Sequence, residues 1–352
     1  MRKGGLEPPR AAPPAPKAGA STNSATFASC SRRRQTNKYS RSCNLPPPIA
    51  ATGGAISVRI SLFAAFSVKR VSVGHYENFP VASKMVPARY RGAIMAIYRF
   101  ARATDDIADE GDGDVAARLA ALEPYRNALD VIERGGTPTL LADLALAVRA
   151  HALPLAPFRD LLSAFTQDVT VKRYATFADL LDYCRRSANP IGRLVLAVYG
   201  VPAVAQSPAL FAASDAICTA LQLTNFWQDI AADYQRGRVY VPQEDMARFN
   251  YPEADLAKRQ YNEHFLQLMQ FEASRAREFF SRAVAELPAE DRRAMAPAEI
   301  MASIYRALLR RIELDKFRVF EKEYRLSKPE KAGRITAQLF KSFLNWPRRA
   351  SV

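Results

Sequence analysis

The segment from residue 208 to 235 constrains the fold of this chain more than any other. Residues 208–230 are apolar nearly all round the expected helix, which is typical of a helix buried in the middle of a bundle. A polar stripe nevertheless follows it in steps of three, four and four residues, at Gln222, Asn225, Asp229 and Asp233. Polar side chains are costly in a buried position unless they face a cavity or a cation. The segment therefore predicts a helical bundle in which the polar stripe of the central helix faces a cavity or a cation.

The acids of this stripe have a counterpart earlier in the chain. Asp105 and Asp109 have the same D-x-x-x-D spacing as Asp229 and Asp233, and both quintets lie in segments that read as helix. Four residues make about one helical turn, so the two carboxylates of each quintet project from one face and can bind the same hard cation. Bridging cations turn the repulsion between carboxylates and a diphosphate into binding. Two such helices face to face predict a site for magnesium and a diphosphate.

Residues before the first quintet extend its polar face. Steps of four, three and four residues connect Tyr98, Arg102, Asp105 and Asp109. The alternative is a surface ion pair between Arg102 and Asp105, which contributes only a few tenths of a kcal/mol. Asp106 and Glu110 also form a competing i,i+4 pair. Only the stripe from Tyr98 selects Asp105 and Asp109 over this pair.

Donors for phosphate oxygens follow the second quintet. Arg236, Arg238 and Tyr240 stand where the long helix is expected to end, and Tyr305 supplies a further phenol near the C-terminus.

The segment from residue 183 to 192 places proline and glycine inside a helical run. Pro190 removes a backbone donor, so a kink is one expectation, and a kink beside small residues lets an apolar chain lie against the backbone. A plain break between two shorter helices is the other expectation.

Composition narrows the function classes. Of the 352 residues 49% are hydrophobic, which is enough to bury a large core. The net charge of +15 is concentrated in residues 1–74, which hold 12 of the 50 Lys and Arg residues but only one acid, so that residues 75–352 carry +4. Without a recognition motif or a basic-aromatic stripe, nucleic-acid binding is not expected. No stretch reaches the ~18 consecutive apolar residues of a membrane helix, so the folded part is expected to be soluble or peripheral.

Residues 1–74 are expected to be a disordered basic tail. Eight prolines precede position 50, and such a Pro- and Ser-rich composition does not form a packed core. Two explanations stay open, a transit-like segment and a translation start assigned too far upstream. The four cysteines form neither a C-x-x-C pair nor a disulfide framework, which favours a reducing cytoplasm.

Helical periodicity is dense from about Tyr76 onward, and strand signals are scarce. Gly and Pro divide the pattern into successive helices. These are predicted at residues 81–110, 114–134, 137–150, 155–173, 176–200, 208–235, 252–286, 289–310 and 312–325. The pattern predicts an all-α single domain over residues 75–331, followed by a C-terminal tail at 332–352.

These residues together resemble the squalene and phytoene synthases. The match spans about His75 to Lys331, includes Tyr183-Cys184 and Tyr305, and rests on two ordered motifs, Tyr98-x-x-x-Arg102-x-x-Asp105-Asp106-x-x-Asp109 and Gln222-x-x-Asn225-x-x-x-Asp229-x-x-x-Asp233-x-x-x-x-Arg238-x-Tyr240. The resemblance implies an isoprenoid synthase helical bundle, in which two acidic helices face each other across a central apolar cavity.

Within this family, residues 75–83 and 187–190 resemble the hydroxysqualene synthase branch of bacterial hopanoid synthesis. Many relatives have Ala-Gly where this chain has Ala188-Asn189. The branch implies that presqualene diphosphate ionises and is captured by one water, which gives hydroxysqualene and diphosphate. One alternative is a presqualene diphosphate, squalene or phytoene synthase that condenses two prenyl diphosphates head to head. A non-catalytic helical scaffold is another.

The resemblance also implies roles for single residues. Magnesium would be held, directly or through water, by Asp105, Asp109, Asn225, Asp229 and Asp233. The implied substrate-binding residues are Arg102, Tyr183, Gln222, Asn225, Arg238, Tyr305 and Phe79. The implied catalytic residues are Asp105, Asp109, Asp229, Asp233 and Tyr98. Aromatic walls of the cavity are expected from Phe79, Tyr98, Phe165 and Phe226.

Magnesium is the expected cofactor. NADPH is not expected, and no G-x-G-x-x-G follows a strand pattern. The expected partner is a prenyl diphosphate, either presqualene diphosphate or farnesyl diphosphate, and no oligomeric state is predicted. Apolar substrates and products favour a cytoplasmic enzyme in peripheral contact with the inner membrane.

Overall fold

Helices form the regular secondary structure of the described residues, which confirms the predicted all-α class. The computed structural model describes residues 86–110, 114–201, 207–287 and 292–344. They belong to one compact unit of the chain, Val68–Val352. The helices are α2 (Ala88–Glu110), α3 (Val115–Glu133), η1 (Thr139–Leu141), α4 (Ala142–His151), α5 (Ala156–Thr170), α6 (Phe177–Ser187), α7 (Asn189–Val198), α8 (Pro208–Gln235), α9 (Gln243–Arg248), α10 (Glu253–Ala257), α11 (Glu263–Glu286), α12 (Arg292–Leu314) and α13 (Lys328–Leu344).

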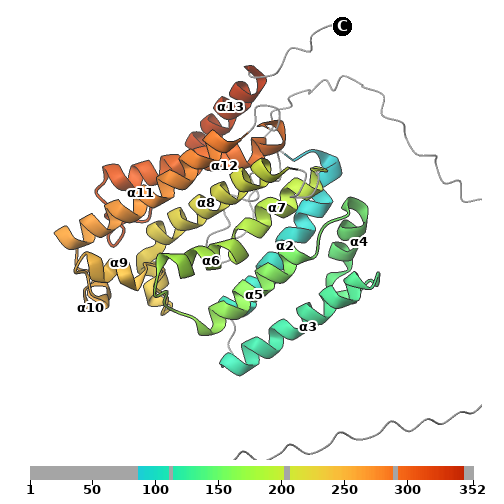
Figure 1. Ribbon diagram of the computed structural model, residues 1–352, viewed down its shortest axis with the longest axis horizontal. Coiled ribbons are helices and arrows are strands. Elements are labelled where there is room, and N and C mark those ends of the chain that lie inside the picture. Colours follow the sequence, from blue (N-terminus) through green and yellow to red (C-terminus); the bar gives the residue numbers. More distant parts are fainter. Residues whose placement is uncertain (1–85, 111–113, 202–206, 288–291, 345–352) are drawn as a thin grey trace, which may run out of the picture. The chain divides into compact units, whose positions relative to one another are not determined.

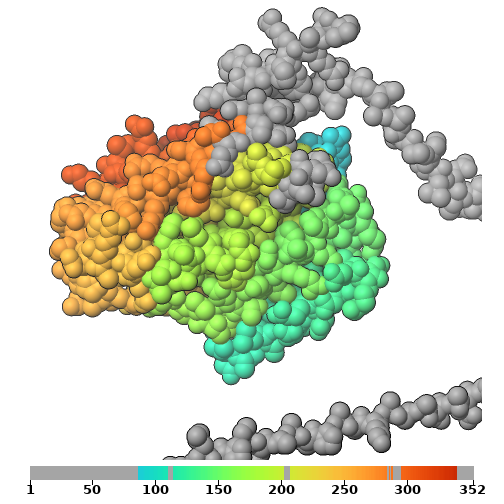
Figure 2. Space-filling model, viewed as in Figure 1, coloured from blue at the N-terminus to red at the C-terminus, as the bar shows by residue number. Residues whose placement is uncertain are grey.

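The long helix α8 is central to this unit, as its all-round apolar pattern predicts. It lies between α11 and α12 and the pair formed by α6 and α7, and it packs against all four (Figure 1). A second group of helices forms around α2, which contacts α3, α4, α5 and α7. In the space-filling view, α6 and α7 lie between the orange C-terminal helices and the green helices (Figure 2). The buried side chains accordingly form two hydrophobic clusters, one around α8 and one around α2.

The helical run predicted at 176–200 is two helices. Helix α6 ends at Ser187 and α7 begins at Asn189, with Ala188 between them. Pro190 is therefore in the first turn of α7, where its missing N–H is not needed for a helical hydrogen bond. Of the two sequence expectations, the break is observed rather than the kink.

Two other predicted helices differ from the structure. The run at 252–286 is divided because the side chain of Asn262 caps α11, accepting a hydrogen bond from the Phe265 amide at 2.9 Å. The helix predicted at 312–325 is wrong, since α12 continues to Leu314 and the chain then turns through left-handed backbone at Lys316 and Phe317.

The described residues test the predictions about the two tails and about membrane spans only in part. Residues 1–74 lie outside the described residues, and α13 crosses the expected domain end at residue 331. Across the described segments, no helix is both long enough and apolar enough to cross a membrane.

A buried ionic cluster links α11 to α9. Glu272 is fully buried, and Arg275 approaches it to 3.3 Å and Asp245 to 2.5 Å. The Arg275 guanidinium also stacks over the Phe177 ring, 3.9 Å from its centroid. Burial raises the pKa of Glu272 to about 8, because the charge of Asp245 reinforces it and Arg275 only partly opposes it.

This raised pKa predicts a pH-dependent stability. The folded protein keeps a proton on Glu272 that the unfolded chain releases above its ordinary pKa of 4.5. The free energy of unfolding should therefore fall as pH rises from 4.5 to 8, by up to about 1.4 kcal/mol per pH unit. Glu272→Gln is expected to flatten this slope in urea unfolding between pH 5 and 8.5. Glu278→Gln, on the exposed face of the same helix, is the control, and equal slopes for both variants would contradict the prediction.

Candidate active site

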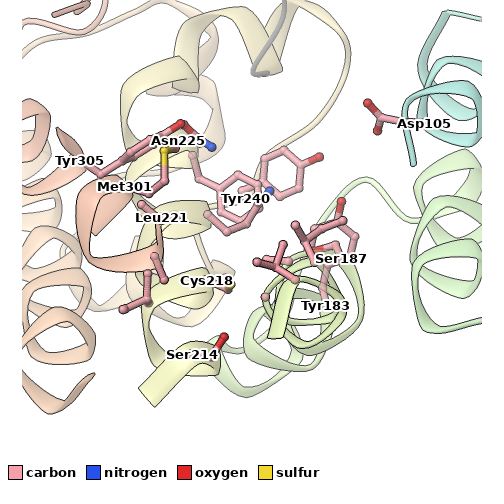
Figure 3. Close-up of a pocket in the computed structure, with 18 of the residues that line it drawn as sticks. Asp105, Tyr183, Ser187, Ser214, Cys218, Leu221, Asn225, Tyr240, Met301 and Tyr305 are labelled. Atoms are coloured by element: carbon pink, nitrogen blue, oxygen red, sulfur yellow. The ribbon is translucent and has the colours of Figure 1, made fainter. Parts of the chain in front are cut away.

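A cavity of about 250 Å³ lies beside α8 and is bounded by residues of α2, α5, α6, α7 and α12. Acidic, amide and phenolic side chains reach it from α2, α8 and α12 in the close-up, and Tyr183 and Ser187 reach it from α6 (Figure 3). Eight of the predicted site residues line it, namely Asp105, Asp109, Tyr183, Gln222, Asn225, Asp233, Arg238 and Tyr305. The structure thus brings both acids of the first quintet, but only Asp233 of the second, to this cavity.

Carboxylates crowd one part of this cavity. Asp105 and Asp109 come from α2, and Asp168 joins them from α5. Burial, together with the charges of Asp109 and Asp168, raises the pKa of Asp105 to about 7. Burial likewise raises the pKa of Asp168 to about 7, although Arg238 opposes the change. Like charges held this closely favour the binding of a cation between them.

Arg238 connects the end of α8 to this carboxylate group. Gly237 precedes it with a φ of 77°, a left-handed conformation that suits glycine and ends the helical segment. The buried Arg238 side chain donates to Asp109. Burial opposes its charge, but Tyr240, Asp109 and Asp168 outweigh burial and hold its pKa above the ordinary value. Arg238 therefore stays a cation at the acidic part of the cavity.

Aromatic faces form the adjoining wall. The rings of Phe226 and Tyr240 stack at a centroid distance of 3.9 Å and an angle of 12°, and Tyr183 lies 5.9 Å from Tyr240. The Tyr183 hydroxyl donates to Asp168 Oδ2 at 2.8 Å, which fixes the orientation of its ring. Phe165 also lines the cavity, as expected. Such π-faces stabilise a carbocation without offering it a nucleophile.

The polar stripe of α8 is bent at Asp229. This residue has non-helical backbone angles, φ −105° and ψ 15°. Asp229 lines a neighbouring pocket of about 390 Å³, which shares Asn225, Arg236 and Tyr305 with the first cavity. That pocket also has basic residues in its wall, Arg259, Lys322, Arg325 and Lys331. The stripe therefore serves two adjoining pockets rather than one.

Besides Asp229, the predicted residues Tyr98 and Arg102 are not in the wall of the cavity. Tyr98 is half-buried on α2 and does not line it. Arg102 approaches Asp106 to 2.5 Å and Asp105 to 3.6 Å. The ion pair between Arg102 and Asp105 that was weighed from the sequence therefore forms, but its side chains are only 25% and 19% exposed. Phe79 lies outside the described residues.

Asp168 is the main residue that sequence reasoning missed. It follows Leu161 and Phe165 in steps of four and three residues, on a face of α5 that is otherwise apolar. A lone acid on a buried helical stripe is costly unless it has a role, and this was the available signal. Met295 and Met301, which also line the cavity, carry no such signal.

The donor set fits a magnesium ion that is shared with a substrate. Within the described segments, no three His, Cys, Asp or Glu side chains converge to hold an ion by themselves. Magnesium is commonly bound by one or two carboxylates, with phosphate oxygens and water completing its octahedron. Asp168 Oδ1 is buried and has no hydrogen-bond partner among the described residues, so it is available to accept from a metal-bound water. Paired carboxylates beside a buried arginine suit a magnesium diphosphate.

The chain is similar in sequence to a phytoene synthase and to a hydroxysqualene synthase. The chain is 33% identical over 273 residues to the 15-cis-phytoene synthase of Synechocystis sp., covering 75% of this chain and 80% of that protein. It is 39% identical over 187 residues to the hydroxysqualene synthase of Zymomonas mobilis, covering 53% of this chain and 61% of that protein.

Solved structures and a family model agree with these relatives. Squalene synthase HpnC from Alicyclobacillus acidocaldarius matches with 34% identity and a TM-score of 0.62, over 69% of this chain and 90% of that one. A dehydrosqualene synthase in complex with ligand matches with 25% identity and a TM-score of 0.65, over 76% and 92%. The model of the squalene/phytoene synthase family matches residues 73–330. The chain therefore belongs to the squalene/phytoene synthase family.

Proposed function

We propose that this enzyme ionises presqualene diphosphate with the help of magnesium and lets one water capture the cation, releasing hydroxysqualene and diphosphate. The main support for the ionisation step is the cavity, in which carboxylates and Arg238 adjoin aromatic faces. Support for the branch comes from the higher identity to the hydroxysqualene synthase of Zymomonas mobilis, 39%, than to the phytoene synthase of Synechocystis, 33%.

Magnesium would be held by Asp105 and Asp109 from α2 and by Asn225, Asp229 and Asp233 from α8. Once bound, it supplies charge neutralisation and Lewis acidity to the departing diphosphate. Asp229 stands in the pocket next to the cavity, and the two spaces share Asn225. The diphosphate is therefore proposed to lie where these two spaces meet.

The chain's own residues bind the diphosphate and protect the cation. Arg238 and Tyr305 face the cavity and donate to diphosphate oxygens. Tyr183, Phe226 and Tyr240 turn aromatic surface toward the hydrocarbon, which excludes bulk water and stabilises positive charge. A dry wall is needed because a carbocation reacts with any nucleophile that it meets.

A second candidate function is the head-to-head condensation of two prenyl diphosphates. It is favoured by the match to the phytoene synthase, which covers 75% of this chain, whereas the match to the hydroxysqualene synthase covers 53%. The two adjoining pockets, both reached by Asn225 and Tyr305, also offer space for two diphosphate groups.

One assay separates these functions. Purified protein and magnesium are incubated with presqualene diphosphate, and separately with farnesyl or geranylgeranyl diphosphate, each with and without NADPH. The expected product is hydroxysqualene from presqualene diphosphate without NADPH. Squalene formed only with NADPH, or presqualene diphosphate or phytoene formed from the shorter substrates, would favour the condensing alternative. A parallel incubation with chelator should abolish turnover.

A further inference from the structure

We propose that the hydroxyl of Ser187 positions the water that captures the cation. Ser187 is the last residue of α6, lies four residues after Tyr183 and lines the cavity (Figure 3). The residue is 7% exposed, and its Oγ is buried without a hydrogen-bond partner among the described residues. This inference rests on the proposed function, because only a water-capturing enzyme needs such a group.

Other buried hydroxyls of the helices behave differently. Thr104 on α2 and Thr224 on α8 are fully buried, and each donates to the carbonyl four residues before it, at 2.8 Å and 2.7 Å. Ser187 makes no such bond, so its donor and its acceptor capacity both stay open toward the cavity. A buried hydroxyl left unpaired destabilises a fold, and native structures normally satisfy it with a water or a ligand. An ordered water at Ser187 removes that cost.

The surroundings of Ser187 make its hydroxyl distinctive. The next lining residues along the chain are Ala188 and Ile191, which are apolar. Tyr183, one turn earlier on the same face of α6, already donates its hydroxyl to Asp168. Asn189 does not line the cavity and instead accepts from Thr219 at 3.0 Å. Within residues 187–190, Ser187 is therefore the residue whose polar side chain lines the cavity.

Water capture forms one new C–O bond at the cation. The bond between carbon and diphosphate has already broken, and the water oxygen supplies the electron pair of the new C–O bond. Ser187 Oγ accepts a hydrogen bond from this water and so directs the water's free lone pair toward the cation. The oxonium that forms then loses one proton to the released diphosphate. Without an oriented water, the cation loses a proton from carbon to the same diphosphate and gives an olefin.

The ratio of alcohol to olefin products tests the inference. With presqualene diphosphate and magnesium, Ser187→Ala is expected to lower the ratio of hydroxysqualene to olefins by about fivefold to tenfold, the effect of one lost hydrogen bond. The rate of diphosphate release should stay within about twofold, because ionisation precedes capture. Ser187→Thr, which keeps a hydroxyl, should restore most of the ratio. Ser163→Ala is the control, since Ser163 is exposed on α5 and accepts from Arg186 outside the cavity.

The outcomes separate the two proposals. If the wild-type enzyme forms hydroxysqualene and Ser187→Ala leaves the product ratio unchanged, Ser187 does not position the water and the proposed function stands. If the wild-type enzyme forms no hydroxysqualene from presqualene diphosphate, the proposed function itself is wrong. Running the reaction in ¹⁸O-labelled water should place the label in the alcohol, and unlabelled alcohol would refute water capture.

Discussion

Replacing Asp105 by asparagine is expected to reduce turnover of presqualene diphosphate by about a hundredfold to a thousandfold. Asp106→Asn is the matched control, because the two carboxylates are adjacent in sequence but face different surroundings. Asp105 lines the cavity, whereas Asp106 does not and lies 2.5 Å from Arg102. The control is expected to keep turnover within about threefold of the wild type, since the ion pair that it weakens lies outside the wall of the cavity.

Asp105→Asn is expected to lower turnover without lowering the thermal stability of the protein. Burial and the charges of Asp109 and Asp168 raise the pKa of Asp105 to about 7, so above that pH the ionised side chain destabilises the folded state. With chelator present at pH 8, Asp105→Asn should therefore melt at the same temperature as the wild type or higher. A variant that loses both stability and activity would indicate a structural role and contradict the proposed site. Full turnover in Asp105→Asn would contradict it more directly.

Local patterns predicted the elements of this fold well. Residues 208–230 are apolar on nearly every face of the helix, and this pattern predicted the central helix, because only a helix surrounded by other helices can bury every face. The D-x-x-x-D spacing placed Asp105 and Asp109 together at the cavity, since four residues span about one turn.

Features that depend on tertiary contacts were beyond such patterns. Non-helical backbone at Asp229 breaks the four-residue register, so Asp229 and Asp233 line different pockets. Arg238 was expected to bind diphosphate, and in this structure it donates to Asp109 on a helix 129 residues away in sequence. Asp168 was missed because its only sequence signal, a lone acid on an apolar helix face, does not reveal that Asp105 and Asp109 of another helix interact with it.

Asp168→Asn is expected to lower turnover by about a hundredfold, although Asp168 belongs to neither acidic quintet. Its carboxylate accepts from the Tyr183 hydroxyl at 2.8 Å and shares the cavity with Asp105 and Asp109. Tyr183→Phe should have a smaller effect of about tenfold, since it keeps the aromatic face and loses only the hydroxyl. The double variant should be hardly worse than Asp168→Asn alone, because Asp168→Asn replaces the charged acceptor by a weaker neutral one and Tyr183→Phe removes the donor of the same hydrogen bond.

The pH dependence of this coupling distinguishes the hydrogen bond from general damage. Burial raises the pKa of Asp168 to about 7, so the folded protein carries a neutral carboxyl at pH 6 and a carboxylate at pH 8.5. A hydrogen bond to a charged acceptor contributes about 1.5–3 kcal/mol, roughly twice that to a neutral one. The coupling energy between the two variants, measured by urea unfolding without divalent cations, should therefore be larger at pH 8.5 than at pH 6. Equal coupling at both pH values would mean that Tyr183 and Asp168 interact only through packing.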